Sequence, residues 1–216
     1  MNNKYITNSL KGLKRDKNQD DVYIVCNDIY ELYVLFDGVS SLPNSHLFIK
    51  NFKLELDSLL KRHKFSLNQL TDIFFHCNKK VTNSRVEGMS TYTALYIDKG
   101  ENLSFYSSIG DSRLYIYSNQ FIEQISNDDS LEGSKNIITK CLGMDNLEVS
   151  DFNFYNVEFN SNFLICTDGF YDLMNDNLEE FFDSLNFKHL KNTKRKLESL
   201  SINKNNDDST YIIIKK

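Results

Sequence analysis

Two amphipathic helical patterns stand next to each other in this sequence, with strand-like runs on both sides of them. Residues 45–63 and 66–83 carry apolar side chains three or four positions apart, which is the spacing of one face of a helix. Strand-like runs, a helix pair, more strand-like runs, a helical section at about 170–200 and a closing strand follow in order. This order is typical of a layered α+β domain.

The strand-like runs are rich in β-branched and aromatic residues, and short polar turns join them. They cover residues 21–26, 31–36, 91–98, 103–109, 112–117, 120–124, 149–159, 163–167 and 210–214. The pair Asn27-Asp28 suits a tight hairpin between the first two runs. An antiparallel sandwich with helices on its outer faces fits this order, although periodicity does not separate it from other α+β folds. A single domain is expected over residues 1–216.

Charge and composition narrow the classes of partner. The formal net charge of −5 argues against a nucleic-acid-binding surface, which needs a basic face. No apolar run approaches the roughly 20 residues that cross a bilayer, and the opening residues lack the apolar core of a secretory signal. The four cysteines are scattered, as is typical of reduced thiols. We therefore expect a cytoplasmic, monomeric protein that binds neither nucleic acid nor membrane.

Acidic residues stand where strand-like runs begin or end. They are Asp20, Asp37, Asp111, Asp168 and Asp207. One Asp-Gly pair after a strand is most simply a turn, because both residues tolerate turn geometry. Five acids at five strand ends are a different matter, because carboxylates that converge repel one another unless cations lie between them.

Such a cluster of carboxylates favours a hard divalent cation. Oxygen ligands suit Mg²⁺ or Mn²⁺, and the sequence holds no His and Cys set of the kind that binds Zn²⁺. Two ions about 4 Å apart can lower the pKa of a bridging water and hold a phosphoryl group for in-line attack. Arg15, close to Asp20 in the chain, is a candidate for binding the phosphate oxygens, although alone it would be read as a solvated charge.

Seven short segments then follow one another in an order that is typical of one enzyme family. They are residues 12–20 (GLKRDKNQD), 34–38 (VLFDG), 89–94 (MSTYTA), 109–113 (IGDSR), 137–143 (IITKCLG), 164–172 (LICTDGFYD) and 207–210 (DDST). Together they resemble the motifs of the metal-dependent type 2C serine/threonine phosphatases, particularly the compact bacterial members. The resemblance covers nearly the whole chain and implies two antiparallel sheets between helix pairs, an αββα sandwich.

The resemblance also implies a role for each matched residue. Asp37 would bridge two Mn²⁺ or Mg²⁺ ions, the Gly38 carbonyl would bind the second ion, and Asp168 with Asp207 would complete the first. Asp20 would hold metal-bound waters, Asp111 with Asp168 would form a third, weaker metal site, and Arg15 would bind the phosphate. The implied reaction is hydrolysis of phosphoserine or phosphothreonine in a protein by a metal-bridged water, and an opposing serine/threonine kinase is the implied partner.

Several positions depart from the family pattern. Ser40 and Ser41 replace paired glycines, and Val39 stands where eukaryotic members carry a His proposed as the general acid, so another acid or water must protonate the leaving oxygen. The remaining substitutions are Ser90 for Gly, Tyr92 for Thr, Asp129 for His and Asp208 for Asn.

A deletion is the largest departure. Between Ser130 and Ile137 the family carries a mobile flap, and only the short stretch LEGSKN remains here. We therefore expect a more open site that contributes less to binding a protein substrate.

The eroded motifs leave a second hypothesis, which is an inactive pseudophosphatase that binds phosphoproteins. The intact acids favour activity. A phosphomonoesterase that acts on small metabolites is a lesser variant.

One basic segment is left over, at residues 188–196 (KHLKNTKRK). Its simplest interpretation is the solvated face of a helix, and the alternative is a docking strip for an acidic phosphopeptide.

Overall fold

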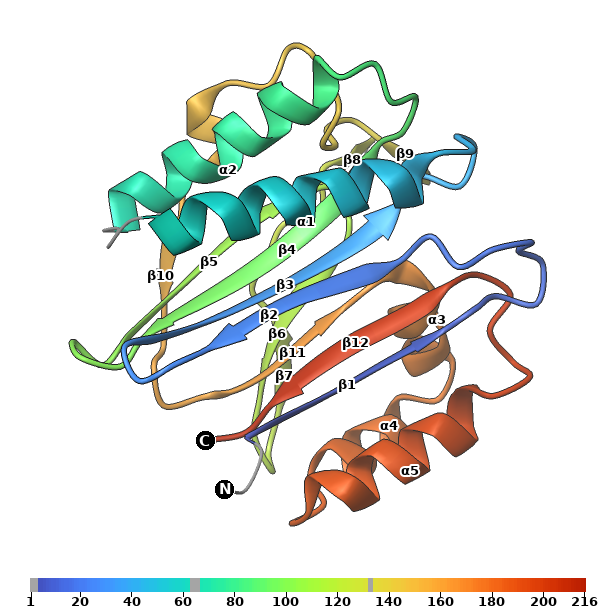
Figure 1. Ribbon diagram of the computed structural model, residues 1–216. Coiled ribbons are helices and arrows are strands. Elements are labelled where there is room, and N and C mark those ends of the chain that lie inside the picture. Colours follow the sequence, from blue (N-terminus) through green and yellow to red (C-terminus); the bar gives the residue numbers. More distant parts are fainter. Residues whose placement is uncertain (1–3, 63–66, 132–133) are drawn as a thin grey trace.

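The computed structural model describes residues 4–62, 67–131 and 134–216, which form four layers (Figure 1). Two helices cover the outer face of one five-stranded sheet. A second five-stranded sheet packs against its inner face, and three further helices cover that second sheet from outside. The predicted α+β sandwich of two antiparallel sheets between helices is confirmed.

The first sheet has the strand order β10-β5-β4-β3-β2 and the second β1-β12-β11-β6-β7, with antiparallel pairing throughout. The strands are β1 (Tyr5–Leu10), β2 (Asp21–Cys26), β3 (Tyr30–Gly38), β4 (Ser90–Asp98), β5 (Leu103–Ile109), β6 (Arg113–Tyr117), β7 (Ile122–Gln124), β8 (Ser130–Leu131), β9 (Ser134–Ile138), β10 (Tyr155–Val157), β11 (Asn162–Cys166) and β12 (Ser209–Ile214). Strands β8 and β9 form a separate small hairpin.

The helix pair consists of α1 (Ser45–Arg62) and α2 (Leu67–Thr82), close to the predicted ranges. The expected ends at His63 and Ser66 lie outside the described residues. The helical section predicted near residues 170–200 is divided into α3 (Asp168–Asp176), α4 (Leu178–Leu185) and α5 (Leu190–Ser201). No helix in the described ranges is both long enough and apolar enough to cross a lipid bilayer.

Strand β3 shows why the central strands read as continuous apolar runs. Its residues 32–36 are completely buried, and neighbouring residues point to opposite faces of the sheet. Leu32, Val34 and Phe36 pack under the helix pair, whereas Tyr33 and Leu35 pack between the sheets. Strands β11 and β12 divide their side chains in the same way between α3–α5 and the layer between the sheets.

One prediction about the strands was wrong, and one strand of the second sheet was missed. Residues 149–159 form a turn of 3₁₀ helix (Val149–Phe152) followed by the short β10, instead of one strand. A local hydrogen bond from the backbone N–H of Glu148 to the carboxylate of Asp151 (2.8 Å) stabilises that turn. Strand β1 was not predicted, because its polar sequence becomes a strand only by pairing with β12 at the other end of the chain.

A half-buried ion pair lies near the start of β3, away from the acidic cluster. Glu31 is 7 % exposed and accepts a hydrogen bond from the Tyr33 hydroxyl (2.8 Å), and its other oxygen lies 2.9 Å from the Lys99 ammonium group. Burial acts to raise the pKa of Glu31, but the contacts with Lys99 and Tyr33 outweigh it, so the pKa lies below the ordinary value of 4.5.

We predict that Glu31→Gln destabilises the protein by about 1–2 kcal/mol at neutral pH, because Lys99 loses a charged partner. A pKa depressed in the folded state stabilises the fold above the unfolded value of 4.5, and this contribution is lost as the pH falls through the lower folded value. Urea unfolding at pH 7 and in the acid range measures the difference. Glu101→Gln, at an exposed position, is the matched control. An equal effect of Glu31→Gln at both pH values would contradict this account.

Candidate functional site

Four of the predicted acids line one pocket of about 400 Å³. Asp37 lies at the end of β3, Asp111 follows β5, Asp168 begins α3 directly after β11, and Asp207 precedes β12. Arg15 and Gly38 line the same pocket, as the sequence predicted. The acids come from both sheets, so the pocket opens at the edge where the two sheets end together.

The carboxyl groups raise one another's pKa. Burial, followed by Asp168, raises the pKa of Asp111 to about 7, and burial, followed by Asp207, raises the pKa of Asp168 to about 6. Burial and then the charges of Asp20 and Asp168 hold the pKa of Asp37 well above its ordinary value. The pocket therefore concentrates negative charge where water does little to screen it.

Asp20 lies beside this pocket and is only partly satisfied. Its Oδ2 accepts a hydrogen bond from the Thr167 hydroxyl (3.2 Å), whereas its Oδ1 is buried without a partner. Burial is the largest cause of its raised pKa, hydrogen bonding with Thr210 and Thr167 opposes it, and the charges of Asp208 and Asp168 add to it. An orphaned carboxylate oxygen beside four other acids is the place where a cation or its water shell would find a ligand.

Arg15 forms a two-pronged ion pair with Asp207. Its Nε donates to Oδ1 (2.5 Å), and one terminal nitrogen donates to Oδ2. Attraction to Asp207 raises the pKa of Arg15 through this hydrogen bond, against a smaller opposite effect of burial. The residue predicted to bind phosphate is therefore turned toward a predicted metal ligand.

Asp208 has a structural role that the sequence analysis missed. Only 5 % of it is exposed, and its two oxygens accept hydrogen bonds from the backbone N–H groups of Gly12 (2.9 Å) and Gln19 (2.8 Å). It thereby fixes both ends of the loop that carries Arg15. The only hint of this role in the sequence was that two acids stand side by side at 207 and 208. Asp207 faces the pocket, and Asp208 faces the loop that carries Arg15.

A second pair of adjacent acids, Asp128 and Asp129, supports the Gly110-Asp111 turn. Gly110 has φ +102°, and an added Cβ would lie 2.4 Å from Thr91 Cγ2, so only glycine fits. Asp129 accepts a hydrogen bond from Gly110 N–H (3.0 Å), and its own N–H donates to the Gly110 carbonyl (2.8 Å). Asp129 therefore supports Asp111 where the family carries a His.

Arg113 anchors the same turn from the other side. Its guanidinium group lies 2.6 Å from Asp128 and 3.7 Å from the centre of the Tyr171 ring in α3. The stack of Arg113 on Tyr171 connects two parts of the site, namely the turn that carries Asp111 and the helix that begins with Asp168. The side chain therefore positions the site and does not line it.

The substituted glycines introduce no backbone strain. Neither Ser40 nor Ser41 has a positive φ, although the departure from the family pattern suggested a tighter backbone there. Ser90 is favourable where glycine was expected, because its hydroxyl lies 2.8 Å from the Asp37 carbonyl oxygen. The end of β3 is thus tied to β4 at the position where Asp37 enters the pocket.

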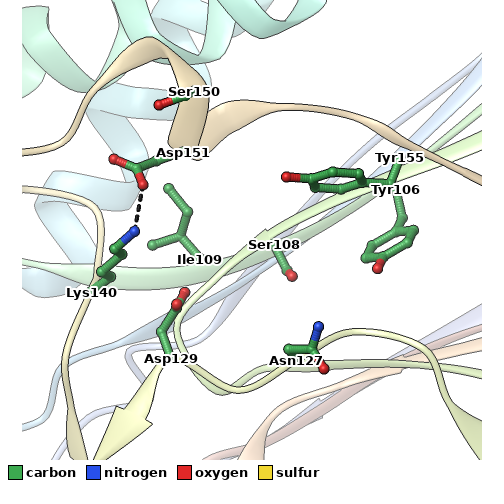
Figure 2. A pocket seen from close by; sticks show the side chains of 9 residues that line it. All are labelled: Tyr106, Ser108, Ile109, Asn127, Asp129, Lys140, Ser150, Asp151 and Tyr155. Carbon is green, nitrogen blue, oxygen red and sulfur yellow. Dashed lines mark hydrogen bonds and ion pairs between the residues drawn. The ribbon is translucent and has the colours of Figure 1, made fainter.

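A second polar cavity, of about 420 Å³, lies behind the Gly110-Asp111 turn (Figure 2). Asp129, Lys140 and Asp151 surround one end of it, with a Lys140–Asp151 ion pair of 2.6 Å, and Tyr106 and Tyr155 surround the other. Lys140 and Asp129 flank the short hairpin β8–β9, which stands where the family flap was expected. Ile138, at the end of that hairpin, lines the acidic pocket.

The residues of the pocket fit hard cations in chemistry, but they are not gathered around one point. The donors are carboxylate oxygens and a main-chain carbonyl, and the orphaned Asp20 Oδ1 lacks a partner. Within residues 4–62, 67–131 and 134–216, however, no three His, Cys, Asp or Glu side chains form a group that could hold an ion. The Arg15–Asp207 pair gives a reason, because it occupies both carboxylate oxygens of one proposed ligand.

Comparison with solved structures shows which proteins share this fold. A serine/threonine phosphatase, Stp1 from Staphylococcus aureus, superimposes with a TM-score of 0.76 at 22 % identity, covering 98 % of this chain and 94 % of that one. The PPM phosphatase MsPP from Mycobacterium smegmatis, solved with cacodylate, gives 0.75 at 18 % identity over 98 % and 97 %. The catalytic domain of the phosphatase PstP, solved with two manganese ions, gives 0.77 at 20 % identity over 97 % and 96 %.

The chain therefore has the fold of the PPM serine/threonine phosphatases, as the sequence motifs predicted. No family model matches the sequence, and no curated protein matches it either. The identity to the solved structures is low enough that the fold is what they establish.

We predict that Gly169→Ala destabilises the protein by about 1–3 kcal/mol, although alanine usually favours a helix. A Cβ at position 169 would lie 2.1 Å from the Asp208 carbonyl oxygen and would push the 207–208 segment away from α3. Urea unfolding measures the effect. Gly100→Ala is the matched control, because its nearest neighbour would be 3.4 Å away, and a loss of stability in both variants would refute the explanation.

Proposed function

We propose that this protein is a metal-dependent phosphatase that removes phosphate from phosphoserine and phosphothreonine in proteins. The observation that carries the proposal is the convergence of Asp37, Asp111, Asp168 and Asp207 with Arg15 on one pocket. The pocket lies in a fold shared with serine/threonine phosphatases, one of which was solved with two manganese ions.

The proposed ligands of two Mn²⁺ or Mg²⁺ ions are Asp37, the Gly38 carbonyl, Asp168 and Asp207, with Asp111 available to a third ion. Such ions, when bound, supply Lewis-acid activation of water and neutralise charge on the phosphoryl group. Ionised carboxylates are needed for this, so ion binding would lower the raised pKa values of Asp111 and Asp168.

The chain's own residues then bind and orient the substrate. Arg15 lies at the edge of the pocket, and its planar guanidinium group suits two phosphate oxygens as well as it suits the two oxygens of Asp207. Asp20, beside the pocket, would accept a hydrogen bond from a metal-bound water at its orphaned oxygen. Val39, Ser40 and Ser41 line the pocket beside Gly38, so this wall offers small side chains to an incoming phosphoresidue.

We predict that turnover of a phosphothreonine peptide requires Mn²⁺ or Mg²⁺ and falls by about 10²-fold or more in Asp37→Asn and in Asp168→Asn, because each loses a charged ligand. The assay measures kcat/KM for the peptide and for p-nitrophenyl phosphate, with each metal and with EDTA. Asp72→Asn, a surface change on α2, is the control.

The second candidate function, a phosphoprotein-binding pseudophosphatase, is favoured by one observation. Asp207, a proposed metal ligand, already forms an ion pair with Arg15. A well-folded protein that binds Mn²⁺ by calorimetry but turns over neither substrate would support this alternative. Turnover of the small substrate alone would indicate a phosphomonoesterase that acts on metabolites.

We predict that Arg15→Ala strengthens the binding of Mn²⁺ and weakens the binding of the phosphopeptide. Release of Asp207 should strengthen Mn²⁺ binding, whereas loss of the guanidinium group should raise KM for the phosphopeptide by about ten-fold or more. Calorimetry and steady-state kinetics measure the two effects. Lys14→Ala, at the exposed neighbouring position, should change neither. Weaker Mn²⁺ binding in Arg15→Ala would show that the ion pair does not compete with the metal.

A further inference from the structure

A second charged pocket, of about 550 Å³, lies at the opposite end of strands β1 and β12 from the acids. Strand β12 begins directly after Asp208, and its last residue, Ile214, is followed by two lysines of this pocket. The start of β1, the C-terminus and the connection from α4 to α5 lie at this end of the molecule (Figure 1). We call it the lysine pocket, after Lys4, Lys188, Lys191, Lys194, Lys215 and Lys216, which line it.

The lysine pocket concentrates positive charge in a protein with a net charge of −5. His189, Ile6 and Leu190 complete its lining, so none of its described lining residues is acidic. The basic residues come from three separate parts of the chain, which the predicted helix face at 188–196 could not reveal. A single solvated helix face does not account for such a convergence.

Acidic side chains neutralise little of this charge, although the Lys216 ammonium group lies over the Phe159 ring (4.0 Å to its centre), outside the pocket lining. The Lys194 ammonium group donates to the Thr7 carbonyl (3.1 Å) and lies 3.8 Å from Glu198, a distance typical of a weak surface pair. The Lys215 ammonium group donates to the Phe187 carbonyl (2.5 Å), which is a neutral partner. Burial lowers the pKa of Lys215, and it also lowers that of Lys216 despite the attraction of Glu31.

We propose that the lysine pocket binds a compact anion that carries two or more adjacent phosphate groups. Ammonium groups are compact point charges that bind phosphate oxygens well, and several of them around one concavity match a ligand with several charges close together. The pocket also contains the N-terminus of α5, where His189 makes no side-chain capping bond, so that end of the helix adds to the positive potential.

An extended polyanion fits this pocket less well. A nucleic acid needs a basic surface along several phosphates, and the net charge of this protein is negative outside the patch. A diphosphate group confines its charge to the volume of the pocket. Such a group is found in free nucleotides and pyrophosphate, and adjacent phosphates also occur on phosphoinositide lipid headgroups, so the test has to distinguish soluble from membrane sources.

The test is calorimetric titration of the whole protein with pyrophosphate at low ionic strength and with EDTA present. The decisive variant is the double charge reversal Lys188→Glu and Lys191→Glu, because both side chains are exposed and lie in the pocket lining. The matched control is Lys50→Glu with Arg195→Glu, the same charge change at two exposed positions outside the pocket, one of them on α5. Arg15→Ala reports any binding at the acidic pocket.

We expect pyrophosphate to bind the unaltered protein and to lose about ten-fold or more in affinity in the lysine-pocket variant only. Orthophosphate should bind more weakly at the same ionic strength. The proposal is overturned if pyrophosphate does not bind, if the control variant loses as much affinity, or if Arg15→Ala abolishes binding. None of these outcomes depends on phosphatase activity.

Parallel titrations identify the source of the ligand. Adenosine triphosphate and vesicles that contain phosphatidylinositol bisphosphate are each compared between the unaltered protein and the lysine-pocket variant. Lysine-dependent binding of the nucleotide indicates a soluble ligand, and lysine-dependent binding of the vesicles alone indicates a lipid headgroup. Vesicle binding that the variant retains would show that membrane association does not use this pocket and would count against the lipid source.

Discussion

The apolar layer between the two sheets is the constraint on which the rest of the structure depends. Its buried members come from β3, β4, β6, β10, β11 and β12, so the strands of both sheets have to pack face to face along their length. Strands held in this way also end together. The acids that follow them, among them Asp37 and Asp168, are therefore brought to one edge and into one pocket.

That arrangement is electrostatically unfavourable unless cations or cationic side chains balance it. Burial and mutual repulsion raise the pKa values of Asp37 and Asp168, and Arg15 balances the charge of Asp207 in an ion pair. Around the pocket, backbone contacts hold the acid-bearing turns in place, notably those made by Asp208 and Asp129. Hydrogen bonds to the backbone thus support the site, while one buried oxygen of Asp20, beside the pocket, has no partner.

Much of the fold was predictable, because periodicity reports burial directly. The helix pair and the central strands were found from apolar spacing, since each buries a face or both faces. Elements stabilised by particular partners escaped that reasoning. Strand β1 depends on β12, some two hundred residues away, and the 3₁₀ turn at Val149–Phe152 depends on the carboxylate of Asp151.

The sequence by itself determined that acids and Arg15 stand beside the ends of strands, because residue type and the apolar pattern of each strand are local properties of the chain. Only the tertiary structure decided which of two adjacent acids faces the pocket, as Asp207 does and Asp208 does not. It also decided that lysines from both ends of the chain meet in one pocket. The reason is physical, since a side chain's neighbours depend on packing between segments that no local pattern encodes.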